Sequence, residues 1–299
     1  MSVSAALRND RLCKALTGMS VQEFKDLVPD FTWYYKEYWA AQRKNPQRGY
    51  GAGRKGCLKT YEEKLFAGLM YLKAYATYDV FGFIIGCDRG QACRWIAHIF
   101  PVLELTLQRK LLLPERKIES IEEFQEKFPG VKEVLVDGTE RRRQRPKKKK
   151  AQQKTYSGKK KAHTRKNIVV ADKNKKILVL TKTKSGRRHD KRLADKEEIF
   201  EHIPPDVTVI TDTAFVGENK VHPNLWLPKK KPKGRDLTWD EKETNTIISS
   251  YRILVEHAIG GIKRYQAVSQ VYRNRKKYFD DKLILLSAGL WNYHLAHTQ

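Results

Sequence analysis

The sequence predicts an α/β domain, a mixed sheet flanked by helices, that follows an all-α domain. Two observations support this division. Residues 1–130 carry apolar side chains at helical spacing, whereas residues 131–299 alternate short β-branched runs with helical segments. Strands that alternate with helices are typical of a sheet covered by helices. A chain of 299 residues is also long enough for two domains of ordinary size.

The composition indicates a polyanionic partner. The formal net charge is +26 at pH 7, which favours nucleic acid first and an anionic membrane surface second, with solubility alone as the third explanation. No run of 18 apolar residues occurs, so no membrane span is expected. The four cysteines form no C-x-x-C pair, which argues against a disulfide framework or a zinc ribbon and favours a reducing compartment.

Capping residues indicate where two helices of the first domain begin. Ser20 is followed three residues later by Glu23, which is the spacing of a capping box. Thr60 precedes a segment with leucines on one helical face, so a second helix is expected from residue 61. Between them, residues 45–56 are rich in glycine and basic residues and are expected to form a linker.

Residues 77–100 have the pattern of a helix-turn-helix. We expect a short helix to Ile85, a turn through Gly86–Asp88 and a second helix from Arg89. Any two packed helices can give such a pattern, which is the structural alternative. Arginine and glutamine are the side chains that contact guanine and adenine edges in the major groove. Three such residues lie near the start of the second helix: Arg89, Gln91 and Arg94.

The positive charge is concentrated in residues 141–166, which hold 14 lysines and arginines and no acidic residue. Pro146 and Gly158 are expected to break any helix, so an extended loop or β-ribbon along DNA phosphates is predicted. A solvated linker or an import signal is the alternative. A second basic cluster occupies residues 229–235 and a third residues 273–277. The expected phosphate contacts in the first cluster are Lys147, Lys148, Lys159, Lys160 and Lys161.

The second domain is expected to contain strands, a hairpin and long helices in alternation. The β-branched and apolar runs predict strands at 131–137, 167–172, 176–182, 207–212 and 225–227, with the second and third forming the hairpin. Helices are predicted at 190–202, 240–263 and 281–294.

Two of the predicted strands end in aspartate, at Asp137 and Asp212. Ligands of open α/β sheets bind beyond the carboxyl ends of the strands, so the two carboxylates converge if the strands are neighbours. Each aspartate also has a structural explanation. Asp-Gly is a common turn signal, and an aspartate after a strand often caps the next helix. Asp190, before another predicted helix, is expected to be such a cap.

The helix predicted at 240–263 carries a third acidic residue, Glu256, between two cations. Arg252, Glu256 and Lys263 fall on one stripe of the helix. A plain i,i+4 surface pair between arginine and glutamate is the alternative. Gly260 and Gly261 indicate a close approach of the backbone to the sheet or a ligand, or else an end of the helix at Gly260.

Three carboxylates together suit divalent metal ions. Mg²⁺ prefers oxygen ligands, and two such ions can hold the attacking and leaving oxygens of an in-line phosphoryl displacement. The surplus of lysine and arginine would then balance the phosphates of a nucleic acid.

These residues together resemble the DDE transposases of bacterial insertion sequences. Within them, the sequence is most similar to the IS-five group, which is related to the Harbinger transposases of eukaryotes. The resemblance rests on three segments, Asp137-Gly-Thr, Asp212-Thr and Arg252-x3-Glu256-x6-Lys263. Residues 156–170 and the pair His189-Asp190 are similar to the pattern between the first two aspartates. One departure is Ser249, which stands where the related signature has tyrosine.

The resemblance implies an RNase H-like fold for residues 131–299. It implies that Asp137, Asp212 and Glu256 are the catalytic metal ligands for two Mg²⁺ ions, with Mn²⁺ able to substitute. Arg252 and Lys263 are then expected to contact phosphate near the scissile bond. The implied reaction is binding of terminal inverted repeats, cleavage that frees a 3′-hydroxyl, and strand transfer into target DNA. A homodimer or larger assembly on double-stranded DNA is expected, in the cytoplasm and associated with a bacterial nucleoid.

Two other functions remain open from the sequence. One is a non-catalytic DNA-binding regulator derived from a transposase, against which the presence of all three acidic residues argues. The other is a structured-RNA-binding protein or ribonuclease that uses the same residues.

Overall fold

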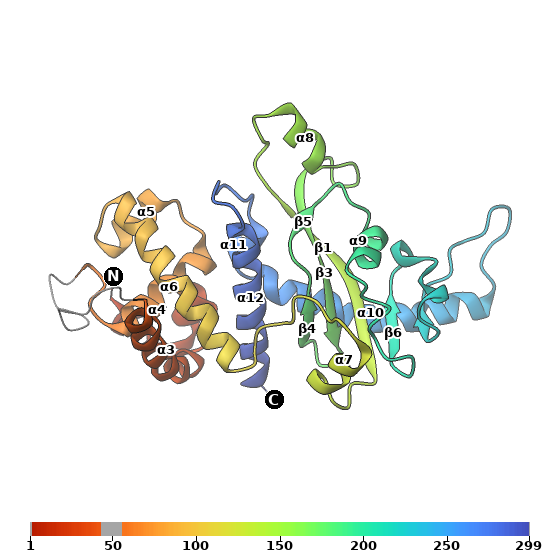
Figure 1. Cartoon of the computed structure of the whole chain (residues 1–299), viewed down its shortest axis with the longest axis horizontal. Helices are drawn as coiled ribbons and strands as arrows, with labels where there is room; N and C mark the ends of the chain where they lie inside the picture. The colour runs from red at the N-terminus through yellow and green to blue at the C-terminus, as the bar shows by residue number, and fades with distance from the viewer. Residues whose placement is uncertain (1, 43–55, 299) are drawn as a thin grey trace. The chain divides into compact units, whose positions relative to one another are not determined.

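The structure, a computed structural model, describes residues 2–42 and 56–298, so the expected linker lies almost entirely outside the described residues. The chain forms two compact units (Figure 1). The first contains residues 1–113, 264–269 and 292–299, and the second contains residues 114–263 and 270–291. No helix among the described residues is long and apolar enough to cross a membrane.

The first unit is helical throughout its described part, as predicted. The capping box predicted at Ser20 is present, and the cap predicted at Thr60 is also a full box: each side chain accepts from the amide three residues on, and the glutamate there closes the box. Glu23 is buried and its Oε1 lies 2.5 Å from Nδ1 of His294, which ties the C-terminal segment to this unit. Its helices are α1 (Val3–Ala6), α2 (Asp10–Thr17), α3 (Val21–Ala41), α4 (Tyr61–Ala74), α5 (Tyr78–Ile85), α6 (Arg89–Arg109) and α11 (Gln266–Ser269).

The helix-turn-helix predicted at 77–100 is formed by α5 and α6. Gly86 ends α5 in the left-handed conformation, with φ of 79°, and the Asp88 side chain accepts from the Gln91 amide to cap α6. Gly82 allows the turn to fold back on α5, because a Cβ at this position would lie 2.6 Å from the carbonyl oxygen of Cys87. The sequence signals therefore place both helices and the turn correctly.

The second unit contains a mixed sheet with β1 in its centre. β1 (Glu133–Arg142) pairs antiparallel with β3 (Ala162–Asp172) and parallel with β6 (Thr208–Thr211), which pairs parallel with β7 (Leu225–Trp226). β2 (Tyr156–Ser157), β5 (Lys184–Ser185) and β4 (Ile177–Leu180) pair with successive parts of β3. The predicted hairpin is thus confirmed, whereas β1 and β3 are longer than expected.

Helices cover the sheet. Alternate residues of β1 and β3, such as Val136 and Ile168, share a buried cluster with Phe124 of α7 (Ile121–Lys127) and Leu193 of α9 (Asp190–Lys196). The long helix α10 (Trp239–Lys263) packs on β1, β3 and β6 and crosses the strands (Figure 1). The unit is completed by the 3₁₀ helices η1 (Thr213–Phe215) and η2 (Glu218–Lys220) and by most of α12 (Phe279–Ala296).

Residues 114–130 belong to the second unit, in contrast to the boundary expected at residue 130. The reason is apolar burial, because Ile118 and Phe124 lie in the core of the sheet unit. The Glu115 amide also donates to the Leu178 carbonyl at the edge of the sheet, and the Leu180 amide donates back to Glu115. A helical pattern alone could not show on which core this segment packs.

The basic stretch 141–166 is not a continuous loop or ribbon, and the expectation that it contains no helix is wrong. α8 (Lys149–Thr155) forms between Pro146 and β2 and stands at one end of the sheet (Figure 1). Its ends are fixed locally, since the Gln152 amide group donates to the Pro146 carbonyl at 2.8 Å. Proline is compatible with the chain just before a helix, which the sequence argument overlooked.

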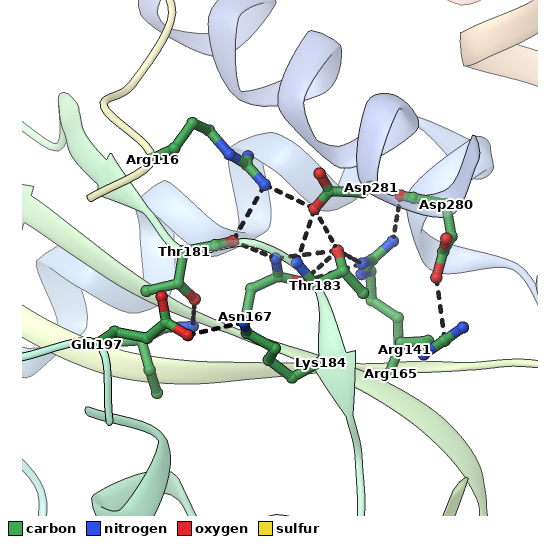
Figure 2. A network of polar contacts seen from close by, with 11 residues as sticks. Arg116, Arg141, Arg165, Asn167, Thr181, Thr183, Lys184, Glu197, Asp280 and Asp281 are labelled. Atoms are coloured by element: carbon green, nitrogen blue, oxygen red, sulfur yellow. Dashed lines mark hydrogen bonds and ion pairs between the residues drawn. The ribbon is translucent and has the colours of Figure 1, made fainter. Parts of the chain in front are cut away.

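A buried polar network joins β1 and β3 to the start of α12 (Figure 2). Arg141 is 5% exposed, and its guanidinium donates to the Asp280 carbonyl, to Asn167 and to Thr183. Asp281 accepts from Thr183 and from Arg116 at 2.6 Å. Burial lowers the pKa of Arg141 to about 10, and the paired carboxylates oppose that decrease. The network therefore fixes the C-terminal end of β1, the strand that carries Asp137.

The two glycines in α10 allow a matched test of this packing. The helix continues through both to Lys263, so Gly260 does not end it. A Cβ at Gly261 would lie 2.3 Å from the Trp291 ring, whereas one at Gly260 would meet nothing within 4 Å. The close approach is therefore to a neighbouring helix, not to the sheet or a ligand.

We expect Gly260→Ala to stabilise the protein by up to about 1 kcal/mol, because alanine favours a helix. Gly261→Ala should destabilise it by about 1–3 kcal/mol, because the methyl group overpacks the site. Thermal unfolding of the two variants measures both effects. Equal shifts of the same sign would contradict the contact with Trp291.

Candidate active site

The first strand places Asp137 beside Asp212. β1 and β6 run parallel with Val136 opposite Thr211, so the residues that follow stand at the same edge of the sheet. This is the neighbouring arrangement on which the convergence of the two carboxylates depended. The strand continues beyond Asp137 to Arg142, so Asp137-Gly138 is not a turn.

Both aspartates are oriented by backbone amides. Asp137 Oδ1 accepts from the Gly138 amide at 2.6 Å, and Asp212 Oδ1 accepts from the Ala214 amide and caps η1. The capping role predicted as the alternative for Asp212 is therefore real, but it uses one oxygen. Oδ2 of Asp212 faces the guanidinium of Arg252 at 3.7 Å.

The third acidic residue reaches the same site through Arg252. Nη2 of Arg252 lies 3.7 Å from Asp212 and 4.0 Å from Oε1 of Glu256, so one cation links the two carboxylates. Glu256 is 57% exposed, whereas Arg252 is 24% exposed. The pair is thus more than a surface i,i+4 contact, because its arginine also faces the sheet edge.

Lys263 lies deeper on the same helix, between charges of both signs. Burial is the main cause that lowers its pKa, the nearby cations Lys160 and Arg141 lower it further, and Asp137 raises it. The structure therefore brings Lys263 into the electrostatic range of both Asp137 and Lys160. Lys159, from the same turn, lines a groove beside Asp212 that is described below.

The surroundings of Asp137 disfavour the charged form of its carboxyl group. Burial raises its pKa to about 6, the charge of Asp212 adds to the increase, and Arg252 opposes it. Asp190 also raises it. Like charges at adjacent strand ends are a common feature of sites that bind a cation or transfer protons.

Asp190 is a site residue whose surroundings the sequence did not reveal. It does not cap α9, since His189 holds the cap position. Its carboxylate instead lies 3.0 Å from Nζ of Lys166, which is nearly buried. A Cβ on Gly138 would lie 2.5 Å from Asp190, so the glycine makes room for this carboxylate beside Asp137. Its membership of the His189-Asp190 pair is the one sequence signal that points to it.

A basic groove of about 490 Å³ leads to Asp212. Side chains from separate basic segments line it, with Lys159 from the β2–β3 turn and Lys230 from the second basic cluster. The start of α9 and the segment after β6 supply the rest of the wall. The lining residues are Lys159, His189, Lys191, Arg192, Asp212, Thr213, Ala214, Val216 and Lys230. A groove of this charge suits a polyanionic strand.

The remaining predicted DNA contacts lie on surfaces. Arg89 and Arg94 are exposed at the start of α6, and Gln91 accepts from Arg94 Nε and Nη2 at 3.2 and 2.9 Å. In the second unit, three lysines are exposed near α8 and the β2–β3 turn: Lys147, Lys148 and Lys161. The structure leaves these side chains accessible, as a DNA contact requires.

The donor set fits a divalent ion in its chemistry. Asp137 and Asp212 offer carboxylate oxygens at one sheet edge, and a cation there would relieve the repulsion that raises the pKa of Asp137. Across residues 2–42 and 56–298, no three His, Cys, Asp or Glu side chains form a ready-made metal cluster. Arg252, which reaches both Asp212 and Glu256, stands between the second and third carboxylates.

Comparisons with known proteins match two parts of the chain to known families and the whole chain to one relative. Residues 136–292 match the family described as DDE superfamily endonuclease, and residues 56–109 match the helix-turn-helix of DDE superfamily endonuclease. A probable transposase for insertion sequence element IS702 from Microchaete diplosiphon is 32% identical over 289 residues, which cover 96% of this chain and 95% of that protein. No solved structure matches the chain significantly.

Asp137→Asn is expected to stabilise the metal-free protein at neutral pH. The folded state raises the pKa of Asp137 from 3.8 to about 6, so it binds this proton more tightly than the unfolded chain does. Stability is therefore lost as the pH rises between these two values, and the loss persists above them. Thermal unfolding in EDTA should show the variant melting about 2–4 °C above wild type at pH 7.5, with little difference at pH 4.

The exposed pair of Asp206 with Lys132 provides the control, because Asp206→Asn should give no such gain at pH 7.5. A melting temperature of Asp137→Asn at or below that of the wild type would contradict the unfavourable charge at this site.

Proposed function

Because the chain belongs to the DDE superfamily of endonucleases and carries the helix-turn-helix of that superfamily, we propose that Asp137, Asp212 and Glu256 are its catalytic residues. The chain is an insertion-sequence transposase that binds and cleaves DNA. The observation that carries the assignment of residues is the paired ending of β1 and β6, with Arg252 linking Asp212 to Glu256. We place the chain in the IS-five group on the residues quoted above.

The reaction depends on a divalent metal ion, as in DDE endonucleases generally. We propose that it is Mg²⁺, that two ions bind, and that Mn²⁺ can substitute. The ions would supply a more acidic water or 3′-hydroxyl and would stabilise charge on the phosphodiester. Asp137 and Asp212 would hold them, and Glu256 would join once Arg252 turns from the carboxylates to a phosphate.

The cations around the carboxylates position the DNA. Arg252 and Lys263 would contact the phosphates next to the scissile bond, where their charge offsets that of the backbone. The groove at Asp212 would hold the neighbouring stretch of the same strand, and exposed lysines near α8 would contact its flanks. Water attack at the scissile phosphorus frees a 3′-hydroxyl, which then attacks a phosphodiester of the target DNA.

The helix-turn-helix would recognise the terminal inverted repeats. The start of α6 would enter the major groove, with Arg89, Gln91 and Arg94 at the base edges. Because two ends must be held during transposition, a homodimer or larger assembly on DNA is proposed. We place the protein in the cytoplasm, on the bacterial nucleoid. No observation favours a regulator without catalytic activity or a function on RNA.

Removing any one carboxylate should abolish metal-dependent nicking. Asp137→Ala, Asp212→Ala and Glu256→Gln are each expected to lower the nicking rate by about 10²-fold or more, because the charge that holds the ions is lost. Gel-shift assays should show that duplex binding is retained. Glu243→Gln, an exposed glutamate on the same helix, is the matched control and should nick normally.

Equal nicking by the wild type and the three variants would refute the catalytic assignment. Tighter binding to RNA than to DNA of equal length would refute transposition itself.

Arg94→Ala should weaken binding to the terminal repeat by about 5–150-fold and reduce discrimination between bases at one position. Lys148→Ala should weaken binding to all DNA sequences by the same factor and reduce the salt dependence of binding. Competition binding with single-base variants of the repeat separates the two effects. If Arg94→Ala weakened binding to every sequence by the same factor, Arg94 would not contact a base edge.

A further inference from the structure

A second hollow, of about 740 Å³, takes part of its lining from two segments that also line the groove at Asp212. Tyr156 and Arg187 line the hollow, and Lys159 and His189, two to three residues further along the same two segments, line the groove. The lining residues of the hollow are Arg145, Gln152, Gln153, Tyr156, His163 and Arg187.

This lining differs in kind from that of the groove. The groove carries lysines, an arginine and an aspartate, which suit a phosphate backbone. The hollow carries an aromatic ring, a histidine, two amides and two guanidinium groups. Aromatic rings stack on bases, amide groups pair with base edges, and guanidinium groups hold phosphates. The combination suits one nucleotide with its base out of the duplex.

The aromatic side chain is available and its support is fixed. Tyr156 is 44% exposed, and its ring packs edge-on against His163 at 5.6 Å between centroids. His163 Nδ1 is hydrogen-bonded to the Thr155 hydroxyl at 3.1 Å. The Ser185 hydroxyl donates to the Lys154 carbonyl, so α8 is tied to both sides of the hollow. A stacking platform needs this rigidity to gain from contact with a base.

The polar groups are also arranged in advance. Gln152 donates from its amide nitrogen to the Pro146 carbonyl, and its oxygen accepts from Arg145 at 3.1 Å. Gln152 therefore positions the Arg145 guanidinium at the rim. Gln153, the next residue, is exposed and is the amide that can contact a base edge.

We propose that this hollow captures one unpaired nucleobase of the DNA end, with Tyr156 as its stacking platform. The proposal rests on the function proposed above and extends it to a specific subsite. β1 connects the two sites, because the Arg143 amide donates to the His163 carbonyl at 2.9 Å. Six residues of extended strand separate Asp137 from Arg143, roughly 20 Å. For a duplex that runs along β1, that distance would correspond to about six base-pair steps from the scissile phosphate.

Binding of two DNA ends with the same sequence tests the proposal. One end is fully paired, and the other has mismatches that unpair the bases around the sixth position. Wild type should bind the unpaired end about tenfold more tightly, because stacking is gained without the cost of opening the duplex. Tyr156→Ala should lose this preference and keep its affinity for the paired end, whereas Tyr156→Phe should keep the preference.

An abasic site identifies the captured base. Scanned through the unpaired region, it should weaken wild-type binding about tenfold at one position and leave Tyr156→Ala unaffected there. The proposal is overturned if wild type does not prefer the unpaired end, if Tyr156→Phe behaves like Tyr156→Ala, or if Tyr156→Ala weakens both ends equally. Metal-dependent nicking by wild type, measured alongside, distinguishes failure of this subsite from failure of the proposed function.

Discussion

The parallel pairing of β1 with β6 is the constraint on which the site depends. Its register sets Val136 opposite Thr211, and the residue that follows each of them is an aspartate. Two like charges are thereby fixed at adjacent backbone positions, and neither can move away without breaking the sheet. Burial is the main cause of the raised pKa of Asp137, and the charge of Asp212, fixed nearby by this register, adds to the increase. The pairing of the backbone thus keeps the two carboxylates close together despite their mutual repulsion.

The chain compensates for this repulsion with cations drawn from distant segments. Arg252 reaches Asp212 from α10, and Lys166 reaches Asp190 from β3. The groove adds lysines from two clusters that lie far apart in the sequence. Each cluster alone resembles a solvated surface, but their convergence on one sheet edge indicates a path for a polyanion. The same charge surplus that makes the free protein strongly basic therefore has a specific location.

Much of this arrangement could be predicted from the sequence, for reasons that are local. β-Branched runs, capping boxes and the turn at Gly86 specify their elements through contacts a few residues apart. The convergence of the two aspartates also followed, because the ends of parallel strands share one edge. Long-range packing could not be predicted. Which core accepts Phe124, and what surrounds Asp190, depend on residues far along the chain. α8 could not be predicted from the view that Pro146 breaks any helix, because this proline only precedes the helix.

The contact between Gly138 and Asp190 has a consequence for the sequences of related chains. The missing side chain of Gly138 leaves the space that the Asp190 carboxylate occupies, on the strand next to Asp137. Any larger residue at 138 must displace Asp190, which would leave the nearly buried Lys166 without that carboxylate. The two positions are therefore expected to vary together during evolution. An alignment that scored the glycine only for backbone flexibility would overlook this coupling.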